Sequence, residues 1–537
     1  MSPFAMLAKA FSQTLVGVDA VRVDVEVDVS GGTEGFATVG LPDAAVKESK
    51  DRVKAALLNS GYHYPRTRIT VNLAPADLRK EGPSLDLPIA LGLLAAADRL
   101  DRDRLARYCV AGELGLDGRV KPIAGALAVA LGARRDGFDG LLIPSANAAE
   151  AAVVEGLAVI PVASFHQAVG FFNGTEEILP ARNDSAAAFA ARPGAHSADF
   201  ADVRGQESAK RALEIAAAGG HNLLMVGPPG SGKTMLAKRL PTILPDMTLE
   251  EAIETTKIHG VAGLLGGSDS ASPAHGGLVS NRPFRSPHHT TSHVAMVGGG
   301  SIPRPGEVSL AHHGVLFLDE MPEFPRATLE VLRQPLEDGH VTVARAAATL
   351  RFPARFILCG AMNPCPCGYL SDPARECRCL PQAVRKYVDR LSGPLLDRID
   401  LHVDVPAVPV REFARPDPAD ADGTPGAGGA ETSATVRARV QAARARQAER
   451  YRHLRGTHCN AHLAPADVKR HCGLDDASRA SLVAALERLG LSARAFDRIL
   501  KVARTIADLA GDERIASDHI AEAVGYRTLD RGQASGA

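Results

Sequence analysis

Hydrophobic and charged residues alternate with a period of two over residues 21–29, where valines occupy every odd position. This period predicts a β-strand with one buried face. Apolar residues then recur at helical spacing over residues 43–58, a second strand pattern covers residues 68–73, and a largely apolar run covers residues 85–97. The pattern predicts an α+β domain over residues 1–178.

A second region, residues 200–405, alternates short apolar strands with helical segments. The strands are predicted at residues 223–226, 315–318 and 356–361. This alternation is typical of an α/β domain with a parallel sheet. Residues 340–352 carry the pattern of a β-hairpin.

The last region, residues 434–531, is predicted to be helical, because apolar residues recur at helical spacing, as at Ile499, Val502, Ala503 and Ile506. Residues 179–199 and 406–433 are rich in small residues and proline and lack periodicity, so we interpret them as linkers. Residues 532–537 form a short tail. The expected architecture is therefore three domains and two linkers.

The composition and charge of the chain exclude some classes of protein. The 537 residues are 45% hydrophobic and 23% charged, and 61 Lys and Arg balance 62 Asp and Glu. The net charge of −1 excludes a uniformly basic nucleic-acid coat protein, but residues 436–537 carry 18 basic against 12 acidic side chains, a local excess of +6. No run of 18 apolar residues and no signal peptide are found, which favours a cytoplasmic protein without membrane attachment.

A glycine-rich loop lies between the strand at 223–226 and the helical pattern after it. The backbone N–H groups of such a loop can surround phosphate oxygens, and the following helix N-terminus adds its dipole. Lys233 would reach the β- and γ-phosphates, and the Thr234 hydroxyl would bind Mg²⁺. The loop therefore predicts a site for ATP and Mg²⁺, formed by Gly227, Pro228, Pro229, Gly230, Ser231, Gly232, Lys233 and Thr234.

Further candidate catalytic residues follow later strands. Asp319 and Glu320 end the strand at 315–318, where Asp319 would hold Mg²⁺ and Glu320 would polarise the attacking water. Asn363 follows the strand at 356–361 and could orient that water or simply cap a helix. Arg398 and Arg494 could stabilise phosphoryl charge, although most arginines form surface salt bridges.

The order of these motifs resembles that of AAA+ ATPases. The runs at residues 282–291, 298–300 and 305–314 look like the magnesium-chelatase-like branch, and within it the chain is most similar to the YifB family. The resemblance covers nearly the whole chain. It implies the ATP-site roles above, a hexameric ring with Arg398 as a finger acting on the neighbouring subunit, and ATP-driven translocation on single-stranded and branched DNA. In that family the motor serves branch migration in homologous recombination during natural transformation.

The N-terminal region resembles a Lon-type protease domain. Ser84 occupies the position of the nucleophile in a matching segment, but Leu127 occupies the position of the lysine base. A serine hydroxyl without an adjacent base is a weak nucleophile. We therefore expect a proteolytically inactive domain.

Two groups of arginines are candidate DNA contacts. Arg345 and Arg351 lie in the predicted hairpin, where ring helicases of this branch carry a pore loop. On the helix expected after residue 434, Arg439, Arg446 and Arg450 fall near one face and could follow a phosphate backbone, although a solvated helix face is an equal alternative. Because the chain has no Trp and only 4% aromatic residues, charge would dominate such binding.

Four of the eight cysteines form two Cys-x-Cys pairs at Cys365, Cys367, Cys377 and Cys379. Four thiolates suit tetrahedral Zn²⁺, although one-residue spacers are unusual and free thiols remain an alternative. Two other functions also remain open. The chain could drive metal insertion as magnesium-chelatase subunits do, or it could be a scaffold whose assembly ATP controls.

Overall fold

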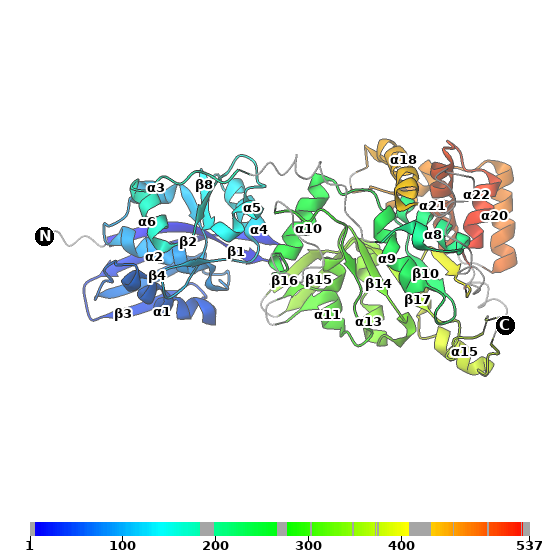
Figure 1. The fold of residues 1–537 in the computed structure, drawn as a ribbon, viewed down its shortest axis with the longest axis horizontal. Coiled ribbons are helices and arrows are strands. Elements are labelled where there is room, and N and C mark those ends of the chain that lie inside the picture. Colours follow the sequence, from blue (N-terminus) through cyan, green and yellow to red (C-terminus); the bar gives the residue numbers. More distant parts are fainter. Residues whose placement is uncertain are drawn as a thin grey trace, which may run out of the picture. The chain divides into compact units, whose positions relative to one another are not determined.

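The computed structural model describes residues 6–182, 198–265, 277–300, 303–345, 348–370, 372, 375–407, 431–454, 456–490, 493–527 and 529. The chain forms two compact units. The first comprises Met1–Arg192 with Thr248–Ser280, and the second comprises Pro193–Met247 with Asn281–Ala537 (Figure 1). Within the described ranges, no helix is long and apolar enough to cross a membrane.

The first unit contains a mixed seven-stranded sheet in the order β3-β4-β2-β1-β5-β8-β9. Antiparallel pairing joins β1, β2 and β4, whereas the other neighbours are parallel. The strands are β1 (Met6–Val16), β2 (Asp19–Ser30), β3 (Gly35–Val39), β4 (Arg68–Ala74), β5 (Tyr108–Val110), β8 (Gly140–Pro144) and β9 (Ala158–Val162). A separate hairpin consists of β6 (Glu113–Leu114) and β7 (Val120–Lys121).

The alternating valines form β2 as predicted, and Val23, Val25 and Val27 are fully buried. The apolar run at 85–97 forms α2 (Asp86–Ala96), in which every residue is buried. A Cβ on Gly92 would lie 2.8 Å from Val27 Cγ2, so α2 packs closely on β2. The other helices are α1 (Ala44–Asn59), α3 (Arg102–Ala106), α4 (Ala126–Arg135), α5 (Ala148–Ala151), α6 (Phe165–Asn173) and α10 (Leu249–Val261).

Helix α10 belongs to the first unit, although the sequence places it within the central region. It packs on α4, and Lys257 forms a 2.6 Å ion pair with Asp19, the first residue of β2. The N–H of Gly125 also donates to the carbonyl of Gly260 at 3.1 Å. The sequence-based prediction placed residues 200–405 in one domain, whereas contacts in the structure place Thr248–Ser280 in the first unit.

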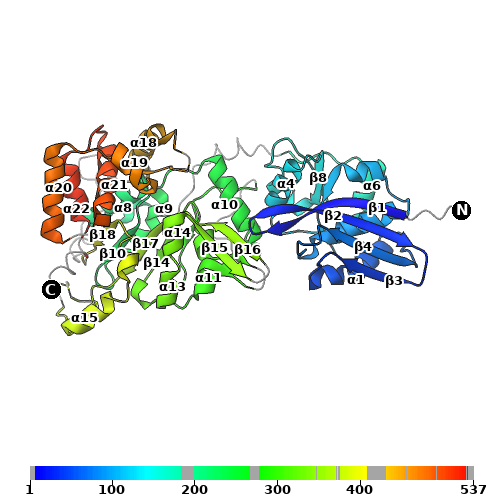
Figure 2. The same cartoon turned by 180° about the vertical axis from the view of Figure 1, so that it is seen from behind.

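The second unit contains a parallel five-stranded sheet in the order β11-β14-β17-β10-β18, as the alternation of strands and helices predicts (Figure 2). Its strands are β10 (Leu223–Val226), β11 (Phe284–Arg285), β14 (Val315–Leu318), β17 (Ile357–Met362) and β18 (Leu401–Asp404). The predicted hairpin is formed by β15 (His340–Arg345) and β16 (Ala348–Pro353), and β12 (Gly298–Gly299) pairs with β13 (Arg304–Pro305). The helices of this part are α8 (Glu207–Gly219), α9 (Lys233–Ile243), α11 (His293–Val297), α12 (Glu307–Leu310), α13 (Arg326–Glu330), α14 (Arg333–Asp338), α15 (Pro381–Val388) and α16 (Gly393–Leu396).

The C-terminal region is helical, as predicted, and shares one hydrophobic core with the sheet. Its helices are α18 (Ser433–Tyr451), α19 (Pro465–His471), α20 (Asp476–Leu489), α21 (Ala493–Ala510) and α22 (Ser517–Gly525). Both α18 and α21 pack on α8. A buried polar network joins α21 to the start of β18: Arg498 contacts Asp400 at 2.7 Å, and His221 lies between Asp400 and Thr505 at 3.3 and 2.8 Å.

Candidate nucleotide-binding site

The glycine-rich loop connects β10, a central strand of the parallel sheet, to α9, which begins at Lys233. A Cβ on Gly227 would lie 2.0 Å from the carbonyl oxygen of Val405, and Gly232 has a φ of 91°. The loop therefore needs glycine at both positions. Because ligands bind at the carboxyl ends of parallel strands, the loop lies where a phosphate site is expected.

Lys233 is the charged centre of the loop and is buried. Its ammonium donates hydrogen bonds to the carbonyls of Gly227 and Pro228 at 2.7 and 2.9 Å, and to Oδ1 of Asn363 at 3.3 Å. Burial lowers the pKa of Lys233, and the nearby carboxylates of Asp319 and Glu320 act in the opposite direction. The structure thus brings together four predicted site residues from the segments that follow β10, β14 and β17.

Two oxygen donors suitable for Mg²⁺ lie side by side. The hydroxyl of Thr234 donates to Oδ2 of Asp319 at 2.7 Å, and the Thr234 side chain is exposed. Hydroxyl and carboxylate oxygens are hard ligands, and Mg²⁺ bound to few protein groups keeps waters and substrate phosphates as its other ligands. The residues present therefore fit a Mg²⁺ ion that a nucleotide shares.

Glu320 directly follows Asp319 and is exposed. Its backbone has φ 50°, a left-handed conformation, and its N–H donates to Oδ1 of Asp319 at 3.0 Å. Oε2 of Glu320 lies 3.8 Å from Nδ1 of His289. An exposed carboxylate beside the loop can reach a water molecule opposite a bound γ-phosphate.

No catalytic role is predicted for His289 from the sequence. The residue follows β11, which pairs in parallel with β14, so His289 and Glu320 both lie beyond the carboxyl ends of adjacent strands. The His288-His289 pair was visible in the sequence, but its proximity to Glu320 depends on the strand order. The strand pairing is the signal that could have identified it.

Of the two candidate arginines, Arg398 has a side chain that the structure describes. Arg398 follows α16, donates to the carbonyl of Pro394 at 2.7 Å and forms an ion pair with Glu337. It lines a cavity of about 600 Å³ together with Arg355, Asp400 and Arg498. Arg494 lies in the first turn of α21, and its side chain is outside the described residues.

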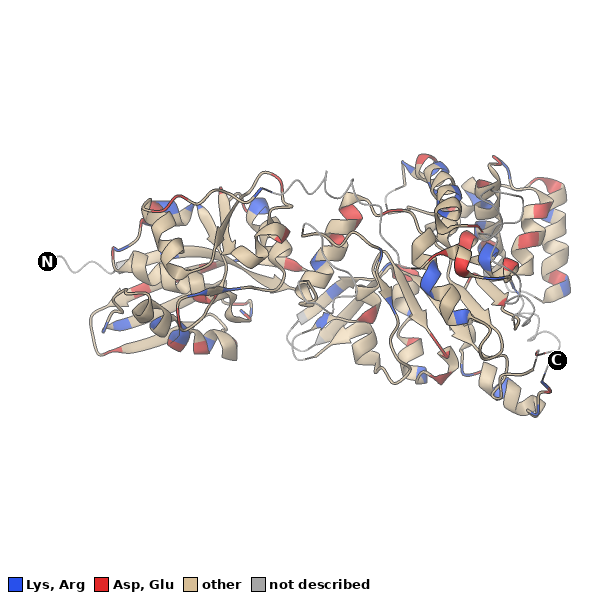
Figure 3. Cartoon of the chain, viewed as in Figure 1, with Lys and Arg blue, Asp and Glu red and all other residues tan. Residues whose placement is uncertain are grey.

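The arginines of α18 have partners within the same unit. In Figure 3 the ribbon of this helix carries recurring blue segments, which mark Lys and Arg residues. Arg439 forms ion pairs with Glu214 and Glu431, and the guanidinium of Arg450 binds both oxygens of Asp508. Arg446 donates to the carbonyl of Asp508 at 2.6 Å. These contacts give all three arginines a structural role and weigh against the predicted phosphate track.

The hairpin β15–β16 carries the other predicted DNA contacts. Arg351 is exposed, and its guanidinium lies 2.8 Å from Nδ1 of His340 across the hairpin. The side chain of Arg345, at the end of β15, is outside the described residues.

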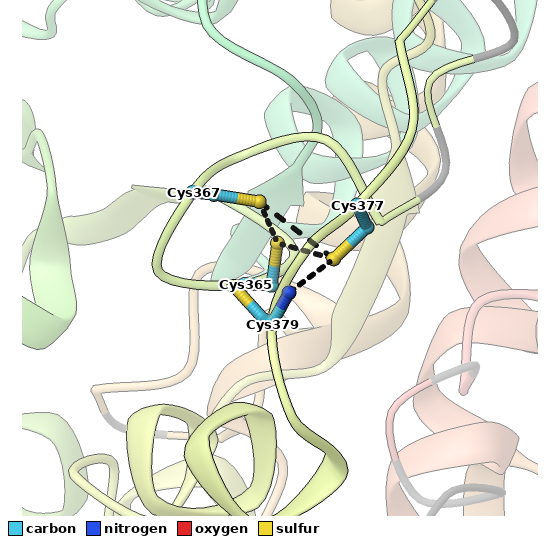
Figure 4. A group of neighbouring side chains, drawn as sticks. All are labelled: Cys365, Cys367, Cys377 and Cys379. Carbon is cyan, nitrogen blue, oxygen red and sulfur yellow. Dashed lines mark hydrogen bonds between the residues drawn. The ribbon is translucent and has the colours of Figure 1, made fainter.

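The four clustered cysteines lie together as the spacing suggested (Figure 4). Their sulfur atoms are all within 4.8 Å of one another. Cys365 is buried, whereas Cys367, Cys377 and Cys379 are half-buried. A cluster of four thiols is suitable for a soft metal ion.

The two protease-like positions lie in different elements of the first unit. Ser84 lies in a short 3-10 helix (Pro83–Leu85), and Leu127 lies in α4 and is fully buried. The N–H of Leu127 donates to Oε1 of Glu150 at 3.0 Å. The leucine contributes only an apolar side chain, and the absence of protease activity stays a prediction.

Three family models match parts of the chain. The model described as "Magnesium chelatase, subunit ChlI" matches residues 199–413, "Subunit ChlI of Mg-chelatase" matches residues 25–147, and "Magnesium chelatase, subunit ChlI C-terminal" matches residues 430–527. All three parts are therefore similar to segments of one protein, the ChlI subunit of magnesium chelatase.

Curated relatives extend this similarity to the full length. Competence protein ComM of Haemophilus influenzae is 46% identical over 528 residues, which cover 98% of both chains. The YifB protein of Escherichia coli is 44% identical over 526 residues, again 98% of both chains. The 38 kDa magnesium-chelatase subunit of Rhodobacter capsulatus is 27% identical over 31% of this chain and 50% of its own length. The chain therefore belongs to the ComM/YifB family of magnesium-chelatase-like AAA+ proteins, which are ATPases that use Mg²⁺.

Proposed function

We propose that the protein is a hexameric, ATP-driven DNA motor that moves branch points during homologous recombination, in the cytoplasm, as part of natural transformation. The observation that carries the proposal is a complete set of hydrolytic groups at one sheet edge in a chain that matches a competence protein over its full length. The substrate strands would be single-stranded and branched DNA.

Each group at the site has a distinct task in ATP hydrolysis. Lys233 binds the β- and γ-phosphates, and it can exchange its hydrogen bonds to loop carbonyls for phosphate oxygens. Thr234 and Asp319 hold Mg²⁺, which neutralises phosphate charge when bound. Glu320 accepts a proton from the attacking water, and Asn363 orients that water.

Coupling between subunits is assigned to Arg398 and Arg494. Arg398 is bound by Glu337 and Pro394 rather than by its own phosphate loop, which suits a guanidinium that acts on the nucleotide of a neighbouring subunit. Such an arginine makes hydrolysis depend on ring assembly. Arg494, at the start of α21, would contact the nucleotide of its own subunit.

DNA contact is assigned first to the hairpin β15–β16. Arg345 and Arg351 lie on its two strands, and phosphate contacts from such residues would be independent of base sequence. The arginines of α18 remain secondary candidates, because Arg439, Arg446 and Arg450 already have intramolecular partners.

Three further assignments complete the proposal. The chain is divided into an inactive protease-like domain (1–178), an ATPase core (200–405) and a helical lid (434–531), with linkers at 179–199 and 406–433. The protease-like domain serves assembly or DNA contact. Cys365, Cys367, Cys377 and Cys379 bind Zn²⁺.

DNA-stimulated ATP turnover tests this function. We expect single-stranded DNA to raise the ATPase rate of the full-length protein. The affinity of the protein for this DNA should fall steeply from low to moderate salt, because contacts with DNA phosphates release counterions. Lys233→Ala should abolish turnover with or without DNA. ATP turnover that ignores DNA would instead favour a chelatase-like metal-insertion motor or an ATP-controlled scaffold.

A further inference from the structure

The cysteine cluster has the dimensions of an occupied metal site. Sγ of Cys365 lies 3.4 Å from that of Cys367 and 3.6 Å from that of Cys377, and the Cys367–Cys377 separation is also 3.6 Å. A tetrahedron with Zn–S bonds of about 2.3 Å has S–S edges of about 3.8 Å. A disulfide would require about 2.05 Å. The separations therefore fit shared coordination of one ion better than an oxidised pair.

The first Cys-x-Cys pair lies directly against the phosphate loop. Cys365 comes two residues after Asn363, and Gly368 then turns back with its N–H donating to the carbonyl of Cys365 at 3.0 Å. Gly368 is buried with φ 86°, and a Cβ there would lie 2.6 Å from Cδ of Pro229. The metal-binding loop and the phosphate loop are thus in van der Waals contact with no room for a side chain.

The second pair leads into a segment that contacts two other parts of the ATP site. Cys379 is followed by α15, where the buried Tyr387 lies close enough to Asn363 for the backbone of Asn363 to oppose the rise in the pKa of Tyr387 that burial causes. Arg390 lies two residues after the end of α15. Its guanidinium donates to Oε2 of Glu323 at 2.7 Å and to the carbonyl of Pro322 at 3.3 Å. Glu323 lies three residues after Glu320 in a 3-10 helix (Met321–Glu323).

We propose that Zn²⁺ bound by the four cysteines clamps residues 365–369 and 377–390 across the ATP site, so that metal occupancy controls how tightly the protein binds nucleotide. Binding releases the thiol protons to solvent and leaves four thiolates on the ion. Without the ion, the two Cys-x-Cys pairs lose their common anchor. The contacts of Gly368 with Pro229 and of Tyr387 with Asn363 then lose the support that holds them at the phosphate loop.

This inference rests on the proposed ATP site, so the two must be tested separately. Elemental analysis of full-length protein should find one zinc per chain, and Co²⁺ substitution should give the absorption bands of a four-thiolate site. Cys377→Ser should lose zinc, whereas the buried Cys109→Ser, far from the cluster in sequence, should keep it. Absence of zinc from wild-type protein, or its retention in Cys377→Ser, would overturn the site whatever the ATPase shows.

Nucleotide affinity, measured by fluorescence of a labelled ATP, tests the clamp. Cys377→Ser should raise the Kd for nucleotide by about tenfold, within the range seen when residues supporting a bound ligand are removed. Gly368→Ala tests the same contact with all four cysteines intact, and should weaken nucleotide binding while zinc is retained. Gly156→Ala is the matched control, because Gly156 has a similar φ of 80° but a Cβ there meets nothing within 4 Å.

The outcomes distinguish the two claims. If wild-type protein bound zinc but no nucleotide, the proposed ATPase function would be wrong, and the clamp with it, while the metal site would stand. If wild-type protein hydrolysed ATP and Gly368→Ala bound nucleotide as tightly as Gly156→Ala, the clamp alone would be wrong. The glycine variants keep the test decisive even if Cys377→Ser does not fold.

Discussion

Thr234 and Asp319 lie 85 residues apart in the chain, yet the threonine hydroxyl donates a 2.7 Å hydrogen bond to Oδ2 of the aspartate. Thr234 lies in the first turn of α9, which follows β10, and Asp319 comes directly after β14; both strands pair with β17, which lies between them. Parallel pairing brings the two carboxyl ends to the same edge of the sheet. The pair therefore offers two neighbouring oxygen atoms to the proposed Mg²⁺ site.

Asp319→Asn should disrupt this pair. The amide is a weaker ligand than the carboxylate, so we expect half-maximal ATPase activity to need about tenfold more Mg²⁺ and the maximal rate to fall. Titration of activity with Mg²⁺ at fixed ATP measures both. Thr234→Val, which removes the other oxygen at equal size, should shift the titration in the same direction; an unchanged Mg²⁺ requirement in both variants would exclude the pair as the ligand set.

Glu320→Gln should separate binding from hydrolysis. The variant retains the size of the side chain but cannot accept a proton from water, so kcat should fall by about 10²- to 10⁴-fold. The Kd for ATP should stay within about threefold of wild type, because Lys233 and the loop are unchanged. Single-turnover kinetics and equilibrium binding measure the two quantities; a variant that turns over ATP normally would remove Glu320 from the proposed mechanism.

His289 is predicted to position Glu320. Its Nδ1 lies 3.8 Å from Oε2 of Glu320, whereas the adjacent His288 contacts the hydroxyl of Thr290 at 3.0 Å. His289→Ala should lower kcat about tenfold with little change in KM, since the glutamate would sample more orientations. His288→Ala is the matched control and should leave kcat near wild type. Equal losses in both variants would indicate a general effect on the loop instead.

Arg398 should act between subunits. Arg398→Ala is expected to lower the ATPase rate by about 10³-fold, the scale on which an arginine finger contributes. Lys233→Ala should be inactive because it lacks the phosphate-binding lysine, but it keeps Arg398. Mixing the two variants should therefore restore part of the activity, wherever the intact phosphate loop of an Arg398→Ala subunit meets the intact Arg398 of a Lys233→Ala neighbour. Mixtures that stay inactive, while size-exclusion chromatography shows mixed rings, would contradict action in trans.

Glu150 provides a pH-dependent test of the first unit. Burial raises its pKa to about 7, against 4.5 when exposed. The folded state therefore binds more protons than the unfolded state between these values, so stability falls as pH rises through that window. Glu150→Gln removes this titration, and its Tm should exceed that of wild type at pH 8 but not at pH 4.5. The exposed Glu155→Gln should show no such pH-dependent difference.

Most of the candidate ATP site could be predicted from the sequence, because each of its residues lies within or directly after a short segment with a recognisable pattern. Lys233 and Thr234 belong to one short loop, and Asp319, Glu320 and Asn363 each follow an apolar strand. Once the strands are taken as parallel, their carboxyl ends must meet, and the site follows from that single assumption. The same reasoning predicted the hairpin β15–β16, because its two strands are adjacent in sequence.

The parts that escaped prediction depend on long-range packing. Periodicity placed Arg439 and Arg450 on a helix, but it could not show that Glu214 and Asp508 cover them. The strand order that brings His289 to Glu320, and the packing of α10 in the first unit, are likewise set by contacts between distant segments. In each case the local pattern predicted the helix or strand, but it did not predict which distant segment that element contacts.

Branch migration on a three-strand DNA junction tests the central claim most directly. The wild-type protein should move the branch point only when ATP and Mg²⁺ are present, and Lys233→Ala should leave the junction unmoved under the same conditions. ATP hydrolysis by the wild-type protein without any movement of the junction would contradict the account.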